Sequence, residues 1–423
     1  MNPRWHVLAL TLIAQAAHAG GLHRVGPNRS FTTIQQAINA ASSGDLILVD
    51  AGNFGPFVIS GKSLSILNEG PRFNLIASST GPVIRIERIR TGQCVTLMGF
   101  NTSVRYGHES PVIIDNCDGP VRIKNASIEP TTSLNAARMS AVVSITNCAA
   151  VSMHSVEVIP STPLNGRTIN GIVVAGSVDR GICAVRLTSS KVHFARCMLR
   201  GYDNLANSPN PEWGGDALRL YHWSSARIDE SPTQFIGGAA RTYGGSAVHL
   251  ISARATEDVE HCGRLFGADR FIRGAAPNLG GFYAKNHDRG QVSSSNRRVP
   301  GCLGTSVGHA TAPARFPINT TQQFTVTANH PRQYVLLVGP SAFQTIPGIN
   351  NAAYVDLLSP NTLVLSFGTL SAPAFSASTS VSLPGLPALI GYQLATQAGL
   401  GVVPGTRRTN PSLSMAEIVV ITQ

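Results

Sequence analysis

One short stretch of this 423-residue chain, residues 202–223, gathers the side chains best suited to chemistry. Carboxylates act as general acids and bases, and an arginine can bind a carboxylate. Aromatic rings pack on sugar faces, and the stretch holds two of the chain's three tryptophans. The candidates are, for catalysis, Asp203, Glu212, Asp216 and Arg219, and, for ligand binding, Trp213, Tyr221, His222 and Trp223. The structural alternative is that both tryptophans fill the interior while the acids are solvated.

The elements that position these side chains follow from a repeat. Three apolar segments of one pattern recur at intervals of about 30 residues, which is typical of proteins built from stacked units. They are Ala184–Leu187, Ala217–Leu220 and Ala247–Leu250. Each has the alternation of a half-buried strand. We expect each segment to pair with the next, so that every unit buries its apolar side against its neighbour.

Stacking these strands predicts a column of cationic side chains. Arg186, Arg219 and His249 hold equivalent positions and are expected to point outward, with Arg85 in the same register earlier in the chain. Equivalent residues on adjacent strands repeat at about 4.8 Å, close to the length of one sugar residue. Because arginine binds a carboxylate through two parallel hydrogen bonds, the column favours an acidic glycan. Arg186, Arg219 and His249 therefore join the ligand-binding candidates.

The composition narrows the classes of protein. Charged residues make up only 13% of the chain, and the net charge is +11. Many Gly, Ser, Thr, Asn and Pro residues favour short strands and turns. Lys and Arg are scattered singly, so no nucleic-acid-binding arm is expected, whereas a basic protein attracts acidic glycans or an anionic cell surface. No metal, nucleotide or serine-nucleophile motif is found, so neither a metal nor a cofactor is expected.

Residues 1–19 have the features of a secretory signal peptide. Arg4 precedes an apolar stretch, and Ala17-His18-Ala19 has the pattern of a cleavage site. The apolar stretch is too short to span a bilayer, and no later segment reaches about 18 uninterrupted apolar residues. We therefore expect a monomeric, secreted or cell-surface protein without a transmembrane segment.

Seven cysteines in an exported chain permit three disulfides and leave one thiol. Cys117 and Cys148 each follow an asparagine and are expected at the same corner of adjacent units. Two alternatives remain open for this pair: a disulfide, or an interior stack of free thiols. Cys262 and Cys302 flank a glycine-rich segment, where a bridge would act as a clamp.

The mature chain begins with a helix pattern, for which Ser30 or Thr32 can supply the N-cap. Its apolar residues fall on one face at helical spacing: Ile34, Ala37, Ile38 and Ala41. Short strands follow at once. This opening, Ser30–Ala41, Gly44-Asp45, Leu46–Val49 and Gly52–Phe54, resembles that of right-handed parallel β-helix proteins of the pectin-lyase-like superfamily. The resemblance implies an all-β fold, with a parallel β-helix over residues 23–310 and the helix as its N-terminal cap.

The superfamily also includes enzymes that act on uronate polymers, some of them lyases that use Ca²⁺. The chain departs from their motifs. Gln234–Gly237 lacks the aspartate of the pectinesterase motif, and the Gly-His-Gly and Asn-Thr-Asp signatures of polygalacturonases are missing. Arg122-Ile123-Lys124 matches a short family motif only in isolation.

After a Gly-, Pro- and Asn-rich segment at residues 272–313, the pattern changes to about six short strands with turns between them. This predicts a small antiparallel β-sandwich over residues 315–423. Leu389–Tyr392 and Arg408-Thr409-Asn410 resemble parts of the terminal β-domain of many secreted bacterial proteins.

Two functions from different classes follow. The first is a non-catalytic secreted or cell-surface β-helix that binds polysaccharide, with an acidic glycan favoured, or serves as an extracellular structural module. The alternative is a diverged polysaccharide lyase or glycoside hydrolase acting on uronate-containing polymers, with Ca²⁺ a cofactor only in the lyase case.

Overall fold

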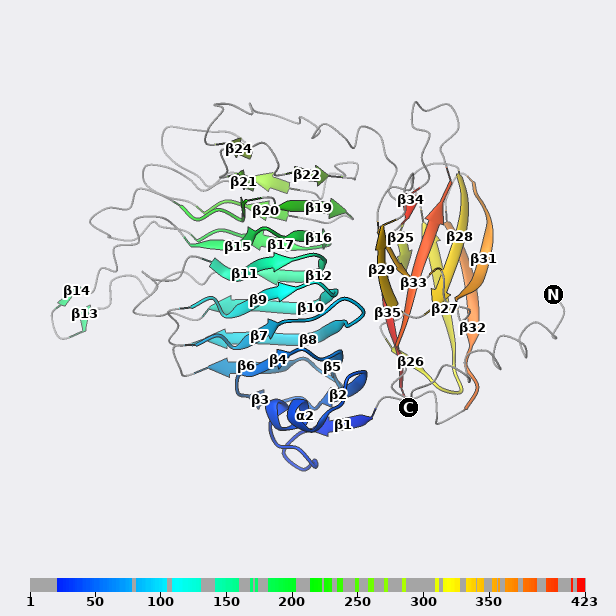
Figure 1. Ribbon diagram of the computed structural model, residues 1–423, viewed down its shortest axis with the longest axis horizontal. Helices are drawn as coiled ribbons and strands as arrows, with labels where there is room; N and C mark the ends of the chain where they lie inside the picture. Colours follow the sequence, from blue (N-terminus) through cyan, green and yellow to red (C-terminus); the bar gives the residue numbers. More distant parts are fainter. Residues whose placement is uncertain are drawn as a thin grey trace. The chain divides into compact units, whose positions relative to one another are not determined.

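The structure is a computed structural model, shown in Figure 1. It describes residues 21–77, 81–104, 109–130, 141–159, 168–169, 172–173, 182–202, 214–222, 224–229, 234–238, 248–250, 258–261, 270–272, 284–286, 309–311, 315–327, 332–339, 341–345, 352–355, 357, 362–371, 376–385, 393–401, 412–413 and 417–422. The predicted signal peptide lies outside these ranges.

The chain divides into two compact units. The first, here called the repeat unit, comprises His23–Ala41 and Ile47–Gly304. The second, here called the C-terminal unit, comprises Thr305–Gln423 with Met1–Leu22 and Ser42–Leu46.

Two long parallel sheets build the repeat unit (Figure 1). The 14-stranded sheet contains β1 Leu22–Val25, β2 Asp45–Val49, β3 Asn53–Phe54, β5 Leu64–Asn68, β6 Phe73–Ala77, β8 Val95–Val104, β10 Val121–Pro130, β12 Val151–Val158, β16 Lys191–Ala195, β17 Met198–Arg200, β19 Ser225–Asp229, β20 Gln234–Ile236, β22 Asp258–His261 and β23 Arg270–Ile272. The eight-stranded sheet contains β4 Phe57–Ser60, β7 Ile84–Glu87, β9 Val112–Cys117, β11 Ala141–Cys148, β15 Cys183–Thr188, β18 Leu218–Tyr221, β21 Val248–Leu250 and β24 Ala284–Asn286. A short antiparallel pair, β13 Thr168–Ile169 and β14 Ile172–Val173, stands apart from both.

Successive strands of the eight-stranded sheet lie side by side in chain order, each from the next repeat of the sequence. Val185 of β15 pairs with Leu218 of β18, which pairs with Val248 of β21. The predicted strand stacking is therefore confirmed for these segments, while Ala247 lies outside the described residues. The prediction of an all-β protein with parallel sheets is likewise confirmed.

The corners between strands carry residues in the left-handed backbone region. Asn116 and Asn147, with φ of 52° and 51°, hold the same corner of consecutive repeats, between the eight-stranded and the 14-stranded sheet. Asparagine tolerates this conformation because its short side chain bonds locally. The Asn147 Nδ2 group donates to Asn116 Oδ1 at 3.1 Å, so the amides form a ladder. Asn125 and Ser155 play the same role where β10 and β12 bend.

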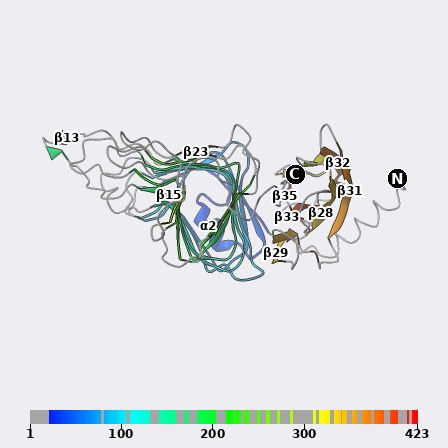
Figure 2. The same cartoon turned by 90° about the horizontal axis from the view of Figure 1, so that it is seen from above.

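Apolar side chains of both sheets fill one continuous core. Viewed from above, the strands surround a common interior (Figure 2). Phe73 and Phe100 stack there with ring centroids 6.1 Å apart, and Phe194 meets Phe235 edge to face at 5.5 Å. Each repeat thus buries its apolar residues against the next, as stacked units require.

Helix α2, Ile34–Ala40, packs Ile34, Ala37 and Ile38 into the first end of this core. Its N-cap is Thr33, in a reciprocal capping box with Gln36. The prediction of a helix here is confirmed, whereas the expected caps are wrong by one position or more. Among the described residues, no helix is long and apolar enough to cross a membrane.

Two side chains join α2 to the first strands. Gln35 Oε1 accepts from the backbone N–H of Val58 at 2.7 Å, and its Nε2 donates to the Val58 carbonyl at 3.4 Å. The amide thereby supplies hydrogen bonds to the edge strand β4, where no further strand follows in the sheet order. Lys62 Nζ donates to the carbonyls of Ile38 and Ala41 at the C-terminal end of the helix.

The C-terminal unit contains small, mainly antiparallel sheets. A three-stranded sheet comprises β25 His309–Thr311, β27 Thr321–Thr327 and β32 Ser376–Ser382. A six-stranded sheet comprises β26 Arg315–Pro317, β28 Arg332–Gly339, β31 Leu363–Leu370, β33 Gln393–Leu400, β34 Ser412–Leu413 and β35 Glu417–Thr422, and β29 Ser341–Thr345 pairs with β30 Ala352–Val355. Phe324 and Val326 of the first sheet share a core with Leu336, Ala398 and Leu400 of the second.

Cys117 and Cys148 are register partners on neighbouring strands, as predicted. Both are buried free thiols, as is Cys183. Of the two open alternatives for the pair, the structure therefore has the interior thiol stack. The neighbouring Cys117 thiol, and then burial, raise the pKa of the Cys148 thiol well above its ordinary value. Cys262 and Cys302 lie outside the described residues.

We predict that Cys117 and Cys148 remain reduced in the folded protein. Thiol alkylation of native protein should leave both unmodified, since each is about 1% exposed or less. Alkylation after unfolding without reductant should modify both, as mass spectrometry of the peptides will show. A peptide pair joined by a disulfide between these two residues would contradict the thiol stack.

An ion-pair network links the first repeats. Arg29 donates to both carboxylate oxygens of Asp50, at 2.8 and 3.0 Å, and lies 3.6 Å from Glu69. Arg24 contacts Glu69 at 3.2 Å. The hydrogen bond from Arg29 holds the pKa of Asp50 below its ordinary value.

A lowered pKa in the folded state means that Asp50 contributes stability above its unfolded pKa of about 3.9 and that this is lost as pH falls further. We expect Asp50→Asn to lower the melting temperature modestly at pH 7, and by less at pH 3. Asp118→Asn, at an exposed position, is the matched control. Equal effects of the two variants at both pH values would contradict this role.

Candidate functional site

The predicted column of cations lies on the outer face of the eight-stranded sheet. The side chains before and after Arg85, Arg186 and Arg219, such as Val185 and Leu187 around Arg186, are buried in the core. The register of the column runs Val58, Arg85, Ile113, Ser144, Arg186, Arg219, His249 and Lys285. The predicted alignment of Arg85, Arg186, Arg219 and His249 is confirmed at the level of backbone register. Side-chain positions are described for Arg85, Arg186 and Arg219.

Arg219 carries its own counter-ion, which the spacing of the sequence did not predict. Asp216 Oδ2 lies 2.7 Å from both Nε and Nη2 of Arg219. The side chains are only 5% and 11% exposed, respectively. Burial opposes the charge on Arg219, but Cys183 and Asp216 outweigh it, so that the pKa of Arg219 is raised. Two of the catalytic candidates thus form one buried ion pair.

Backbone packing fixes the position of Asp216. The chain leaves the described part at Tyr202 and returns at Gly214, and the two ends are held together: Gly215 N–H donates to the Tyr202 carbonyl at 2.8 Å. Tyr202 N–H in turn donates to Ile182 O at 3.2 Å. A Cβ atom on Gly215 would collide with the Ile182 carbonyl, so the close approach requires glycine here. Tyr202 and Gly215 are therefore held together directly next to Asp216 in the chain.

Arg186 occupies the next position down the column. Its Nη2 donates to the hydroxyl of Ser144, its register partner on β11, at 3.1 Å. The side chain is half-buried. The fully buried thiol of Cys183 lies near both arginines, and burial raises its pKa to about 11. Cys183 is therefore protonated at neutral pH and is not a nucleophile.

A second outward column runs two residues further along the same strands. In register it contains Ser60, Glu87, Asp115, Thr146, Thr188 and Tyr221. Thr146, Thr188 and Tyr221 are half-buried and line the part of the face next to Arg186 and Arg219. Hydroxyl groups thus lie beside the arginines, while carboxylates lie lower on the sheet.

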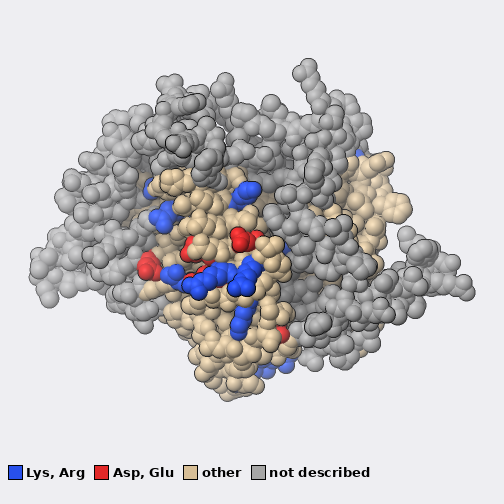
Figure 3. All heavy atoms as spheres, in the orientation of Figure 1, with Lys and Arg blue, Asp and Glu red and all other residues tan. Residues whose placement is uncertain are grey.

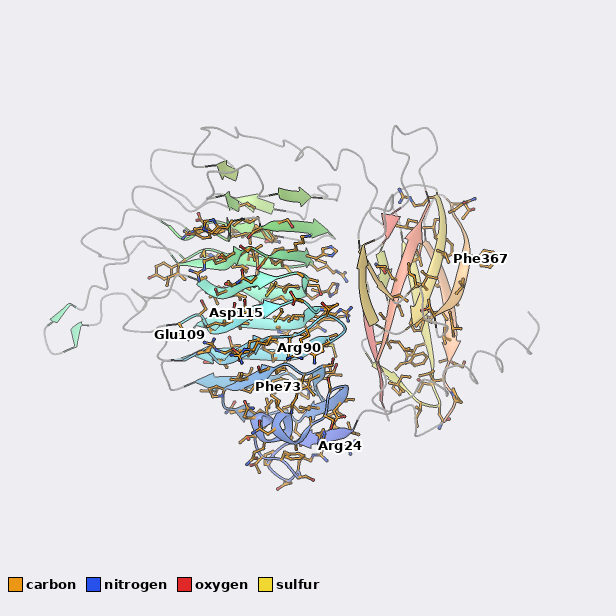
Figure 4. The ribbon with its side chains drawn as sticks, in the orientation of Figure 1. Arg24, Phe73, Arg90, Glu109, Asp115 and Phe367 are labelled. Carbon is orange, nitrogen blue, oxygen red and sulfur yellow. The ribbon has the colours of Figure 1, made fainter. Side chains whose placement is uncertain are left out.

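Charge is locally balanced around β7 and β9, toward the first strands of the eight-stranded sheet. Arg85 contacts the exposed Glu109 at 3.4 Å. Figure 4 shows Glu109, Asp115 and Arg90 on this side of the repeat unit. In Figure 3, blue and red side chains lie next to one another over the region of β7 to β10. The described surface seen in this view is therefore mixed in charge.

The remaining candidates divide by whether the structure describes them. Tyr221 and His222 end the strand β18 and begin the next corner, with ring centroids 6.4 Å apart, and His222 is exposed. The other four, Asp203, Glu212, Trp213 and Trp223, lie outside the described residues. For His249 the structure describes the backbone position alone.

Sequence analysis missed three members of this cluster. Ser144 and Cys183 become neighbours of the arginines through strands β11 and β15, whose alignment brings residues about 40 positions apart together. The strand alignment of β11 with β15 would have been the signal for Ser144. Glu109 precedes a strand by two residues and has no motif that could have identified it. Across the described residues, no three His, Cys, Asp or Glu side chains are placed to hold a metal ion.

The sequence and the structure were compared with known proteins. No family matches the sequence, and neither curated proteins nor solved structures give a significant match.

We predict that Asp216→Asn is strongly destabilising, since removal of one member of a buried ion pair costs about 3–5 kcal/mol. Arg219→Met should have a comparable effect, and the double variant should lose less stability than the two single losses added together. Arg85→Met is the control, because its partner Glu109 is 51% exposed and such pairs contribute about 1 kcal/mol or less. Chemical denaturation measures all four. Additive losses at Asp216 and Arg219 would contradict the pairing.

Proposed function

We propose that this protein is a secreted, non-catalytic right-handed parallel β-helix that binds acidic polysaccharide on the outer face of its eight-stranded sheet. The parallel pairing of consecutive repeats and the pectin-lyase-like opening support the β-helix. The signal-peptide pattern of residues 1–19 supports export, which places the protein among extracellular glycans.

The observation that carries the binding proposal is the half-buried Arg186 amid polar neighbours. Ser144 holds one Nη2 hydrogen of Arg186, and a guanidinium has five donors in all. A guanidinium can donate two parallel hydrogen bonds to a uronate carboxylate, and a partly buried site strengthens such charge-assisted bonds. Thr188 and Tyr221 belong to the neighbouring column and supply hydroxyls for the sugar ring.

The state of Asp216 supports binding without catalysis. Hydrolysis of a glycosidic bond needs two carboxylates placed on either side of it. The charge of Asp216 is balanced by Arg219, and the residue is 4% exposed. A carboxylate held in this way serves to fix the arginine beside the binding face. The arrangement therefore suits a rigid platform better than an acid–base pair.

The test is the affinity of the full chain for oligogalacturonides, measured by titration calorimetry. We expect Arg186→Met to weaken binding at least about tenfold, since hydrogen bonds to charged groups contribute about 1.5–3 kcal/mol. Arg72→Met removes the same charge at an exposed position before β6, outside the eight-stranded sheet, and should leave affinity within about twofold. Affinity should fall as salt rises, because screening weakens exposed charge pairs.

Equal affinity of wild type and Arg186→Met would refute this binding face. Incubation with pectate and alginate, with and without Ca²⁺, tests the alternative that the protein is a polysaccharide lyase or glycoside hydrolase. Release of unsaturated products or reducing ends by the wild-type protein would show that it is an enzyme and would overturn the non-catalytic proposal.

A further inference from the structure

Arg332 is a buried cation in the core of the C-terminal unit. It is the first residue of β28 and, by strand alternation, shares a face with Tyr334 and Leu336. Directly opposite lies Leu370, which is fully buried in the same core. Arg332 is itself 5% exposed. Its Nε atom has no hydrogen-bond partner among the described residues.

Among the described strands of the C-terminal unit, no acidic residue lies in register with this end of β28. From residue 305 onward the sequence contains two acidic residues, Asp356 and Glu417. Glu417 pairs with Thr396, which pairs with Val338 near the other end of β28. Six residues separate Val338 from Arg332, a distance of about 20 Å along a strand.

Asp356 lies outside the described residues. Its neighbour in sequence, Val355, pairs with Ser341, two residues beyond the last residue of β28. Among the described residues of the C-terminal sheets, Arg332 therefore stands in an apolar setting, with the strand position of Glu417 far from it. Burial accordingly lowers the pKa of Arg332, and it is the one cause of the shift.

Burying a charge lowers the stability of a fold unless a counter-charge or hydrogen bonds offset the cost. A neutral side chain of similar length would fill the same space with a smaller loss of stability. An arginine in this position gains from an anion that comes from outside the chain. Its planar guanidinium fits the two oxygens of a carboxylate, sulfate or phosphate group.

We propose that Arg332 anchors an oxyanion-binding site at the edge of the core of the C-terminal unit, with a carboxylate, sulfate or phosphate group as ligand. This site is separate from the glycan-binding face proposed for the repeat unit, and it requires no residue of that face. The C-terminal unit would then bind an anionic molecule in its own right.

The experiment compares wild type and Arg332→Met as full chains in thermal unfolding. Sodium phosphate, sodium sulfate and sodium glucuronate are titrated against sodium chloride at constant ionic strength. We expect a saturable rise of several degrees in the melting temperature of wild type with at least one oxyanion. Arg332→Met should lack this saturable rise, and in chloride alone it should melt at or above the wild-type temperature. The anion that raises the melting temperature shows whether the ligand is a carboxylate, a sulfate or a phosphate.

Two further variants keep the outcome decisive. Arg186→Met removes the proposed glycan contact and should retain the anion effect, so that failure of one proposal is distinguishable from failure of the other. Arg332→Lys keeps the charge, and it should show a weaker but still saturable rise if the methionine variant does not fold. A rise of equal size in wild type and both Arg332 variants would reflect general salt effects and would overturn the site, as would no rise in wild type.

Discussion

Parallel register is the constraint on which the repeat unit depends. Because each strand pairs in line with its counterpart in the next repeat, equivalent residues stand about 4.8 Å apart in columns. Apolar columns are stabilised by this spacing, because neighbouring side chains such as Phe73 and Phe100 pack against each other in the core. Cationic columns repel unless counter-charges intervene. Asp216 beside Arg219 and Glu109 beside Arg85 meet that requirement from loops next to the strands.

Stacking also leaves open ends and sharp corners that the sequence must resolve locally. At the first end, Gln35 hydrogen-bonds both backbone groups of Val58, while α2 covers the apolar interior. At the corners, the chain turns through left-handed residues, and Asn116 and Asn147 bond to each other as they turn. The same polar residues thus shape the backbone and satisfy their own hydrogen bonds. These devices allow one side of the sheet to present a regular outer face.

Much of this arrangement could be predicted from the sequence, because the spacing of the repeats indicates which residues of neighbouring strands are aligned. The alignment of Arg186 with Arg219 and His249, and that of Cys117 with Cys148, needed only the repeat. The partner of Arg219 could not be found in this way, since Asp216 owes its position to glycine-mediated packing of Gly215 on Ile182. In the C-terminal unit, the serines and threonines of β32 give no apolar signal from which its extent could be predicted. Tertiary pairing with β27 outweighs that weak local preference.

The buried arginines of the two units differ in their counter-charges, and the difference bears on the proposed ligand binding. In the repeat unit, Arg219 is neutralised by Asp216, and the half-buried Arg186 donates to Ser144 and is the arginine proposed to bind a glycan. In the C-terminal unit, Arg332 is buried without an acid from its own sheets in reach. Low dielectric strengthens any ion pair that forms in either setting, and it penalises an unpaired charge equally. If both proposals hold, anions stabilise this pattern, and the net charge of +11 agrees with that. Anion binding would then contribute to fold stability as well as to recognition.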